Sequence, residues 1–199
     1  MKAALRLTAL AVALCLAGPV AAQKIKMNGG GGGFAIGANG GFYTLSGNDF
    51  ETTDAGFGLN GFVRYNFPSG FSISGGFQWN THNDDSIDES ITIIGVIVDP
   101  RYYFQLKTPT VTPFVGGRAG YLRESVTVAG FDLSASGFAF GGTGGILFQA
   151  SPQFAIETTV SFQSLSFGDV DVDGTTVPNT DASGTSLGIS AGLVISFPK

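Results

Sequence analysis

The stretch Phe71-Ser72-Ile73-Ser74-Gly75-Gly76-Phe77-Gln78-Trp79-Asn80 alternates large apolar residues with small or polar ones. Successive side chains of a β-strand point to opposite faces of its sheet. The aromatic residues and Ile73 therefore share one face, and the serines, Gln78 and Asn80 share the other. Whether the apolar face meets a protein core or lipid depends on how such strands are connected.

Eight segments with this alternation are predicted as strands. They span residues 33–45, 56–67, 71–80, 91–106, 111–124, 137–149, 154–166 and 185–197. Links 68–70, 107–110 and 150–153 are short, whereas links 46–55, 81–90, 125–136 and 167–184 are long. Short and long links alternate, so an up-and-down meander places them at opposite ends of the sheet.

Acidic residues gather in the long links. These residues are Asp49, Glu51, Asp54, Asp84, Asp85, Asp88, Glu89, Asp132, Asp169, Asp171, Asp173 and Asp181. Glu124 borders the long link 125–136, only Asp99 and Glu157 lie well within predicted strands, and the short links carry no acid. One end of the sheet is therefore predicted to be hydrated and anionic, and the other compact.

Composition bears on whether the sheet closes in lipid. The chain has 31 glycines and 18 phenylalanines, and only 13% of its residues are charged. A soluble β-sandwich also alternates, but its outer faces should be strongly charged, and these are not. Long links at one end and short ones at the other are typical of membrane barrels. We therefore predict an all-β fold, an eight-stranded antiparallel up-and-down transmembrane β-barrel.

The N-terminal residues have the pattern of a secretory signal. Lys2 and Arg6 precede an apolar run, and Val20-Ala21-Ala22 suits signal cleavage. We predict a signal peptide at 1–22, a Gly-rich lead-in at 23–32 and an outer-membrane β-barrel at 33–199. Removing 1–22 changes the net charge from −5 to −7, which disfavours nucleic acid as a partner.

Two features refine the predicted barrel. Aromatic residues near the short links predict a ring at the compact rim. The ring comprises Phe67, Phe71, Phe104, Phe114, Phe148, Phe154 and Phe197. Pro100 cannot donate to a strand ladder, so either a bulge at Pro100 or an offset of strand 91–106 is expected.

Five charged residues fall on the face opposite the lipid-facing set. They are Arg64, Asp99, Arg101, Arg118 and Glu157. We expect Arg64 and Glu157 to pair across the lumen, with the other three in a second layer. Glycines on the same face leave room for them: Gly58, Gly75 or Gly76, Gly116, Gly120, Gly141, Gly145, Gly188 and Gly192. An eight-stranded barrel is just wide enough for its own side chains, so an ionic plug is favoured over a pore.

Two loop segments suggest other chemistry. Asp169, Asp171 and Asp173 begin like a calcium loop, but no acid stands at the twelfth position. A plain hairpin turning at Asp173-Gly174 is the alternative. His82 lies close to Asp84, Asp85 and Ser86 and could serve a nucleophile, but all four are predicted in one hydrophilic loop without rigid support. No cofactor is predicted.

The final strand, Ser190-Ala191-Gly192-Leu193-Val194-Ile195-Ser196-Phe197, resembles the C-terminal signal of bacterial outer-membrane proteins. Segments 113–121 and 101–104 are similar to those of small barrels of the OmpA, OmpX and opacity-protein kind. The resemblance implies location in the outer membrane of a diderm bacterium. It also implies recognition by the barrel-assembly machinery through Gly192, Ile195 and Phe197.

Relatives of this kind stabilise the envelope, adhere to surfaces or form small pores. The resemblance therefore implies a non-enzymatic envelope or adhesin-like role through the acidic loops. A narrow porin-like channel is one alternative, and a lipid A-modifying enzyme using His82 and Ser86 is another. Expected partners are outer-membrane lipid, lipopolysaccharide and a surface ligand at the loops.

Overall fold

The structure, a computed structural model, describes residues 33–84, 89–106, 110–128, 130–178 and 180–197. The predicted signal peptide, 1–22, and the Gly-rich lead-in, 23–32, lie outside the described residues. Within the described residues, no helix is long and apolar enough to cross a membrane.

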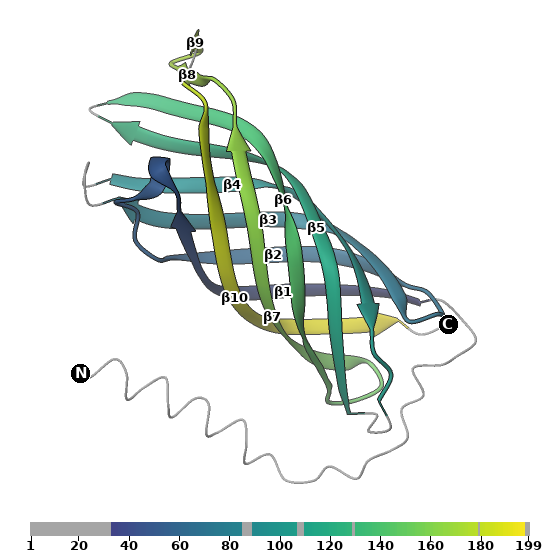
Figure 1. Cartoon of the computed structure of the whole chain (residues 1–199). Coiled ribbons are helices and arrows are strands. Elements are labelled where there is room, and N and C mark those ends of the chain that lie inside the picture. Colours follow the sequence, from purple (N-terminus) through teal and green to yellow (C-terminus); the bar gives the residue numbers. More distant parts are fainter. Residues whose placement is uncertain (1–32, 85–88, 107–109, 129, 179, 198–199) are drawn as a thin grey trace, which may run out of the picture.

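Eight long strands form the wall of the molecule (Figure 1). They are β1 Gly33–Ser46, β2 Gly56–Asn66, β3 Phe71–Asp84, β4 Glu89–Tyr103, β5 Val111–Val128, β6 Phe131–Gln149, β7 Phe154–Phe167 and β10 Ala182–Phe197. Each strand pairs antiparallel with its sequence neighbours, and β1 pairs with β10. The sheet is therefore a closed eight-stranded barrel, as predicted.

The strands are strongly staggered around the barrel. Paired residues can be followed once around it, through Ile36, Val63, Gly75, Val98, Ala119, Phe140, Ser164, Thr185 and Ser46. The path returns to β1 ten residues further along, at Ser46 instead of Ile36. Stagger of this kind tilts the strands, so residues at one height are not the directly paired ones.

Large apolar side chains cover the outside of the barrel from the end with the short turns to an outer boundary near the long links. On β3 the outward apolar positions run from Phe71 to Trp79, about the length that crosses a bilayer when tilted. At the outer boundary the outward residues turn polar, as where Thr81 follows Trp79 and Arg123 follows Tyr121. We place the membrane-spanning segments between the short turns and this outer boundary.

One member of the predicted aromatic ring is misplaced. Phe114 faces the lumen and is only 3% exposed, whereas Phe71, Phe148, Phe154 and Phe197 face outward. The alternation of β5 decides this, because Phe114 shares its face with Arg118. The prediction for Phe114 was therefore wrong.

Pro100 sits in β4 without a bulge or an offset. The β4–β5 register is the same on both sides of it, with Val98 opposite Ala119 and Arg101 opposite Gly116. The ladder to β5 omits Asp99 and Pro100, so the missing N–H falls in a local gap.

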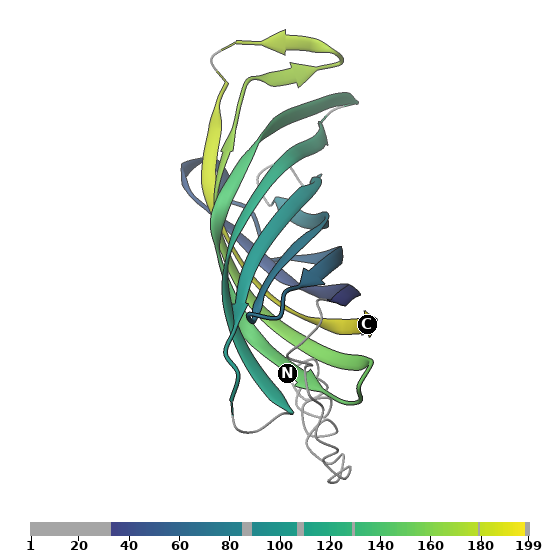
Figure 2. The ribbon, with the colours of Figure 1, turned by 90° about the vertical axis from the view of Figure 1, so that its right-hand side faces the viewer.

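Several strands continue beyond the outer boundary. β5 and β6 extend to a turn near Gly130, and a small hairpin of β8 Val170–Val172 and β9 Thr175–Val177 lies beside β6. Figure 2 shows this hairpin projecting past the rim of the barrel. A short 3-10 helix, η1 Asn48–Phe50, follows β1 at the same end.

Candidate functional site: the barrel interior and its outer rim

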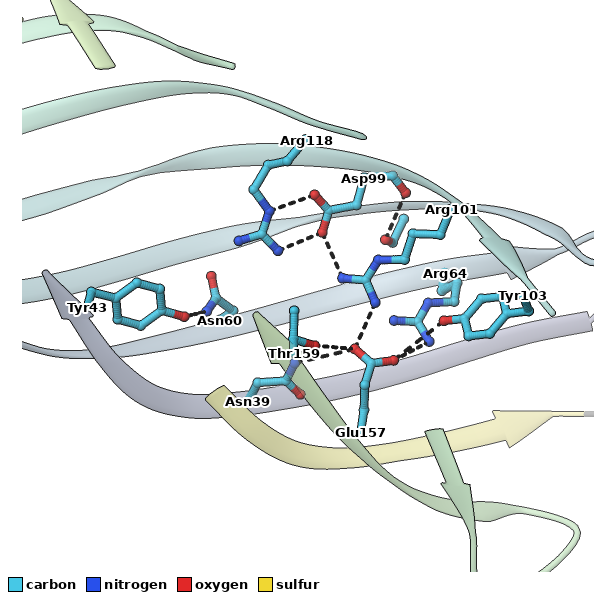
Figure 3. Close-up of polar contacts among 11 residues, drawn as sticks. Asn39, Tyr43, Asn60, Arg64, Asp99, Arg101, Tyr103, Arg118, Glu157 and Thr159 are labelled. Carbon is cyan, nitrogen blue, oxygen red and sulfur yellow. Dashed lines mark hydrogen bonds and ion pairs between the residues drawn. The ribbon is translucent and has the colours of Figure 1, made fainter. Parts of the chain in front are cut away.

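Five inward-facing charged residues form one connected chain inside the barrel (Figure 3). Arg64 Nη1 lies 2.8 Å from Glu157 Oε2, and Arg101 Nη1 lies 2.8 Å from Glu157 Oε1. Arg101 Nη2 lies 2.9 Å from Asp99 Oδ2. Arg118 binds both oxygens of Asp99, at 2.7 and 2.8 Å. The structure brings together all five predicted residues and pairs Arg64 with Glu157 as expected, but Arg101 links that pair to Asp99, so the residues form one chain instead of two layers.

Small residues on neighbouring strands give these side chains room. Gly116 stands opposite Arg101, Gly141 opposite Arg118, and Gly192 opposite Glu157. A Cβ on Gly116 would lie 2.8 Å from Arg101 Cγ, closer than real contacts allow. Other inward glycines serve an aromatic instead, because Gly58 and Gly188 both lie against the ring of Tyr43.

The carboxylates of Glu157 and Asp99 pair with three guanidinium groups, and all five side chains are buried. Arg64 lies over the ring of Phe62, 4.5 Å from its centroid, and Arg101 lies over Phe114 at 4.7 Å. Tyr103, Asn39 and Thr159 donate longer hydrogen bonds of 3.4–3.5 Å to Glu157. A buried charge is tolerated only when it is paired in this way.

Apolar layers close the lumen on both sides of the ionic chain. Towards the short turns lies a cluster of Ala35, Phe62, Tyr103, Phe114, Leu147, Ala155 and Val194. Towards the outer rim lies a larger cluster of Leu45, Phe50, Ile91, Ile93, Ile97, Leu122, Ala135, Ala139, Leu165 and Phe167. The division into an apolar outer face and a polar inner face was therefore incomplete, since apolar side chains also cluster inside the lumen at both ends of the ionic chain.

A polar layer lies between the ionic chain and the outer apolar cluster. It includes buried side chains from β2, β3 and β7, among them Asn60, Gln78, Asn80 and Gln163. Asn60 donates to the hydroxyl of Tyr43. Within the described residues, Gln78 Oε1 and Gln163 Nε2 have no hydrogen-bonding protein partner. Buried groups of this kind are ordinarily satisfied by ordered water.

The segment 47–55 folds over the outer mouth of the barrel. Phe50 inserts into the outer apolar cluster and is 2% exposed. Asp49 Oδ2 accepts a 2.8 Å bond from the Ser183 amide on β10. On the other side, Thr52 Oγ1 donates to Asp84 Oδ1 at 2.9 Å, and the Asp54 amide donates to the Asn83 carbonyl at 2.8 Å. The segment is thus attached to β10 and β3, the two strands that flank β1 and β2, and Phe50 fills the mouth between them.

Two titratable groups lie under this segment, beyond the outer membrane boundary. Burial raises the pKa of Glu124 to about 7, and the negative charge of Asp49 adds to the effect. Burial lowers the pKa of His82, and its hydrogen bond with the Asp54 carbonyl opposes that shift. Both groups therefore favour the neutral form at the mouth of the barrel.

The loop predicted to hold the catalytic alternative is largely strand. His82 and Asp84 lie on the inward face of β3, which runs to Asp84, so their placement in a flexible loop was wrong. Asp85 and Ser86 lie outside the described residues. His82 Nδ1 is 3.2 Å from the Asp54 carbonyl, and Asp84 binds Thr52 and Thr53. In the described part of the chain, these contacts attach segment 47–55 to β3.

The Asp169, Asp171 and Asp173 segment forms the hairpin alternative. Asp173 and Gly174 make the turn between β8 and β9 with φ values of 49° and 82°. Asp171 accepts from Thr176, and Asp173 accepts from the Asp132 amide. In the part of the chain that the structure describes, no three acidic, His or Cys side chains gather as a metal site.

The predicted assembly signal lies along β10 at the end with the short turns. Phe197 and Ile195 face the lipid side, and Leu193 continues their row. Gly192 faces the interior, where a Cβ would lie 2.4 Å from Asn39 Oδ1. The recognition role of Gly192, Ile195 and Phe197 stays a prediction.

Sequence reasoning did not identify Phe50, Tyr43 or Asn60 as parts of the site. Tyr43 and Asn60 share the inward parity of Asn39 and Arg64, so alternation alone could have included them. Phe50 lies in a link, where alternation carries no information. The sequence feature that could have identified Phe50 is that it is a single phenylalanine among polar loop residues.

Comparisons with known proteins agree with this architecture. The sequence profile described as "Outer membrane protein beta-barrel domain" matches residues 8–197. A search of curated proteins found no significant match. The crystal structure of Neisserial surface protein A is similar with a TM-score of 0.64 and 18% identity, covering 84% of this chain and 99% of that one. A major outer membrane protein from Thermus thermophilus gives a TM-score of 0.55 and 13% identity, covering 83% and 99%. These structures share the fold, and the chain belongs to the outer membrane protein beta-barrel domain family, crossing the bacterial outer membrane with its strands.

Proposed function

We propose that the protein is a closed, non-enzymatic barrel that stabilises the outer membrane and presents its acidic outer hairpins to surface partners. The observation that carries the proposal is the filled lumen. Arg101 joins Glu157 and Asp99 across the interior, and the side chain of Phe50 fills the outer mouth. An eight-stranded barrel filled in this way is rigid and leaves its function to the outer surface.

The outer hairpins supply a surface for partners. Polar and acidic side chains of β5, β6 and β8 share one face there, including Thr127, Asp132 and Asp171. By orientation rules for such barrels, the long links lie outside the cell and the short turns in the periplasm. Partners of this face are expected to be cationic or to bind through hydrogen bonds.

The experiment replaces residues 169–178, which hold the β8–β9 hairpin, with a short Gly-Ser linker. Adhesion of cells carrying this variant to host or abiotic surfaces should fall severalfold, with unchanged amounts of protein in the membrane. A matched control replaces Asp171 and Asp173 with asparagine, which keeps the turn and removes charge. Unchanged adhesion in the hairpin deletion would refute the surface role.

A channel is the alternative function, and planar-bilayer recordings separate the two. The wild-type barrel is expected to give no steady single-channel steps, because paired charges and two apolar layers fill its lumen. Regular conductance steps from purified protein would favour the channel instead.

A further inference from the structure

A groove opens on the outer wall where the barrel leaves the membrane. It is lined by Tyr121 and Phe138, by the hydroxyls of Ser136, Ser166 and Ser183, and by Asp181. These hydroxyl-bearing residues and Phe138 face outward from β5, β6, β7 and β10. The groove thus lies at the level of lipid headgroups and not in the lumen.

Arg123 stands at the edge of this groove. It lies two residues beyond Tyr121 on the same face of β5 and directly opposite Ser136 on β6. Its side chain is exposed, and Nη2 donates a 2.9 Å bond to Ser134 Oγ. Of the described residues, Arg64, Arg101 and Arg118 lie in the lumen, so Arg123 is the one cation on the outer wall.

From the groove towards the membrane centre, the outer wall carries first a row of aromatic rings and then a strip of glycines. The rings of Tyr121, Phe138 and Phe140 descend the wall, with centroids 5.3 and 6.2 Å apart. Below Phe140, Gly142 and Gly144 face the lipid. A Cβ on either one would meet only a neighbouring carbonyl oxygen at 3.6 Å, so the space over them is open.

We infer that this wall binds one phosphorylated, multiply acylated glycolipid of the outer leaflet, the chemistry of lipid A. A guanidinium group pairs well with a phosphate, so Arg123 would hold the headgroup phosphate. Serine hydroxyls and the Asp181 carboxylate would bind the sugar hydroxyls, and the carboxylate keeps the phosphate on the Arg123 side. An acyl chain would lie on the rings and in the glycine strip.

The inference rests on the outer-membrane location and not on the proposed role of the hairpins. Its test titrates the full mature chain, in nanodiscs of phosphatidylcholine, with bisphosphorylated lipid A and counts bound molecules by native mass spectrometry. Wild type is expected to bind one molecule preferentially. Arg123→Gln should weaken binding about tenfold, because one charge-assisted contact is lost.

Two matched controls separate a built site from general attraction. Arg123→Gln combined with Thr81→Arg returns the charge to the same level on the far wall, and should not restore binding. Gly142→Leu with Gly144→Leu fills the strip and should weaken binding severalfold. Gly61→Leu with Gly75→Leu adds the same bulk on the far wall, where nothing lies within 4 Å, and should not weaken binding.

Three outcomes would overturn the inference. They are restored binding in the variant that combines Arg123→Gln with Thr81→Arg, equal loss of lipid A binding in both leucine pairs, and equal binding of phosphatidylglycerol. The last would show that any lipid phosphate suffices. Heat-modifiable migration on gels verifies that each variant is a folded barrel, so a loss of binding cannot come from misfolding.

Discussion

Arg101 on β4 and Glu157 on β7 are joined across the barrel interior by a 2.8 Å bond between Nη1 and Oε1. The two strands are not hydrogen-bonded to each other, so the bond crosses the lumen and does not follow the wall. Glu157 also binds Arg64, and Arg101 also binds Asp99. The pair is therefore the centre of the ionic chain.

Glu157→Gln is expected to destabilise the barrel by about 3–5 kcal/mol, because it leaves Arg64 and Arg101 buried with too little opposing charge. Urea unfolding in lipid vesicles, followed by Trp79 fluorescence, measures the loss. The control removes both members of the Arg64–Glu157 ion pair, as Arg64→Met with Glu157→Met, and should recover part of the stability. Equal stability of Glu157→Gln and wild type would contradict the role of Glu157.

Phe50→Ala is expected to release segment 47–55 from the outer mouth. The lost apolar contact of a buried phenylalanine is worth about 3 kcal/mol or more. Limited proteolysis of intact vesicles should cut this segment at least tenfold faster than in wild type. Phe131→Ala is the control, because Phe131 is 55% exposed and should leave the cutting rate unchanged.

The attachment of segment 47–55 is expected to weaken as the pH rises towards 7. The pKa of Glu124 is raised to about 7 by burial and by the charge of Asp49. The folded state therefore holds the proton of Glu124 more tightly than the unfolded state does. The stability gained from this protonation is lost as the pH rises through about 7. Proteolysis of the segment between pH 5 and 8 measures this, and Glu124→Gln should remove the weakening with rising pH. The lowered pKa of His82 acts with the opposite sign, so weakening with rising pH that persists in Glu124→Gln would assign the effect to another group.

Calcium is expected not to bind the β8–β9 hairpin. Asp171 and Asp173 already accept hydrogen bonds from Thr176 and the Asp132 amide, and they do not converge with a third acid in the described part of the chain. Calorimetric titration with millimolar calcium should give no saturable heat. Saturable heat that disappears on Asp171→Asn would restore the calcium interpretation.

Gly188→Ala is expected to cost about 1–3 kcal/mol, the usual cost of overpacking. The added Cβ would lie 2.4 Å from the ring of Tyr43 and would disturb its hydrogen bond with Asn60. Urea unfolding measures the cost. Gly61→Ala is the control, because Gly61 faces open lipid and should change stability little.

Alternation along the chain was enough to predict the closed eight-stranded barrel, because side chains in strands change face at every residue. The inward placement of Arg64, Asp99, Arg101, Arg118 and Glu157 followed from the same rule, and the hairpin turn followed from Asp173-Gly174. Strand ends were less accurate, since β3 to β6 continue beyond the membrane. Polar residues in those extensions look like loop residues in the sequence.

The sequence by itself determined which residues face lipid and which face inward, through a local property of each strand. The sequence also predicted the Arg64–Glu157 pair, but only the tertiary structure decided that Arg101 joins this pair to Asp99. The stagger of ten residues around the barrel sets their heights, and it places Arg101 between Asp99 and Glu157. The same applies to Phe50, whose burial depends on Asp49 reaching β10 and Thr52 reaching β3. Such contacts join residues far apart in the chain, so no local pattern encodes them.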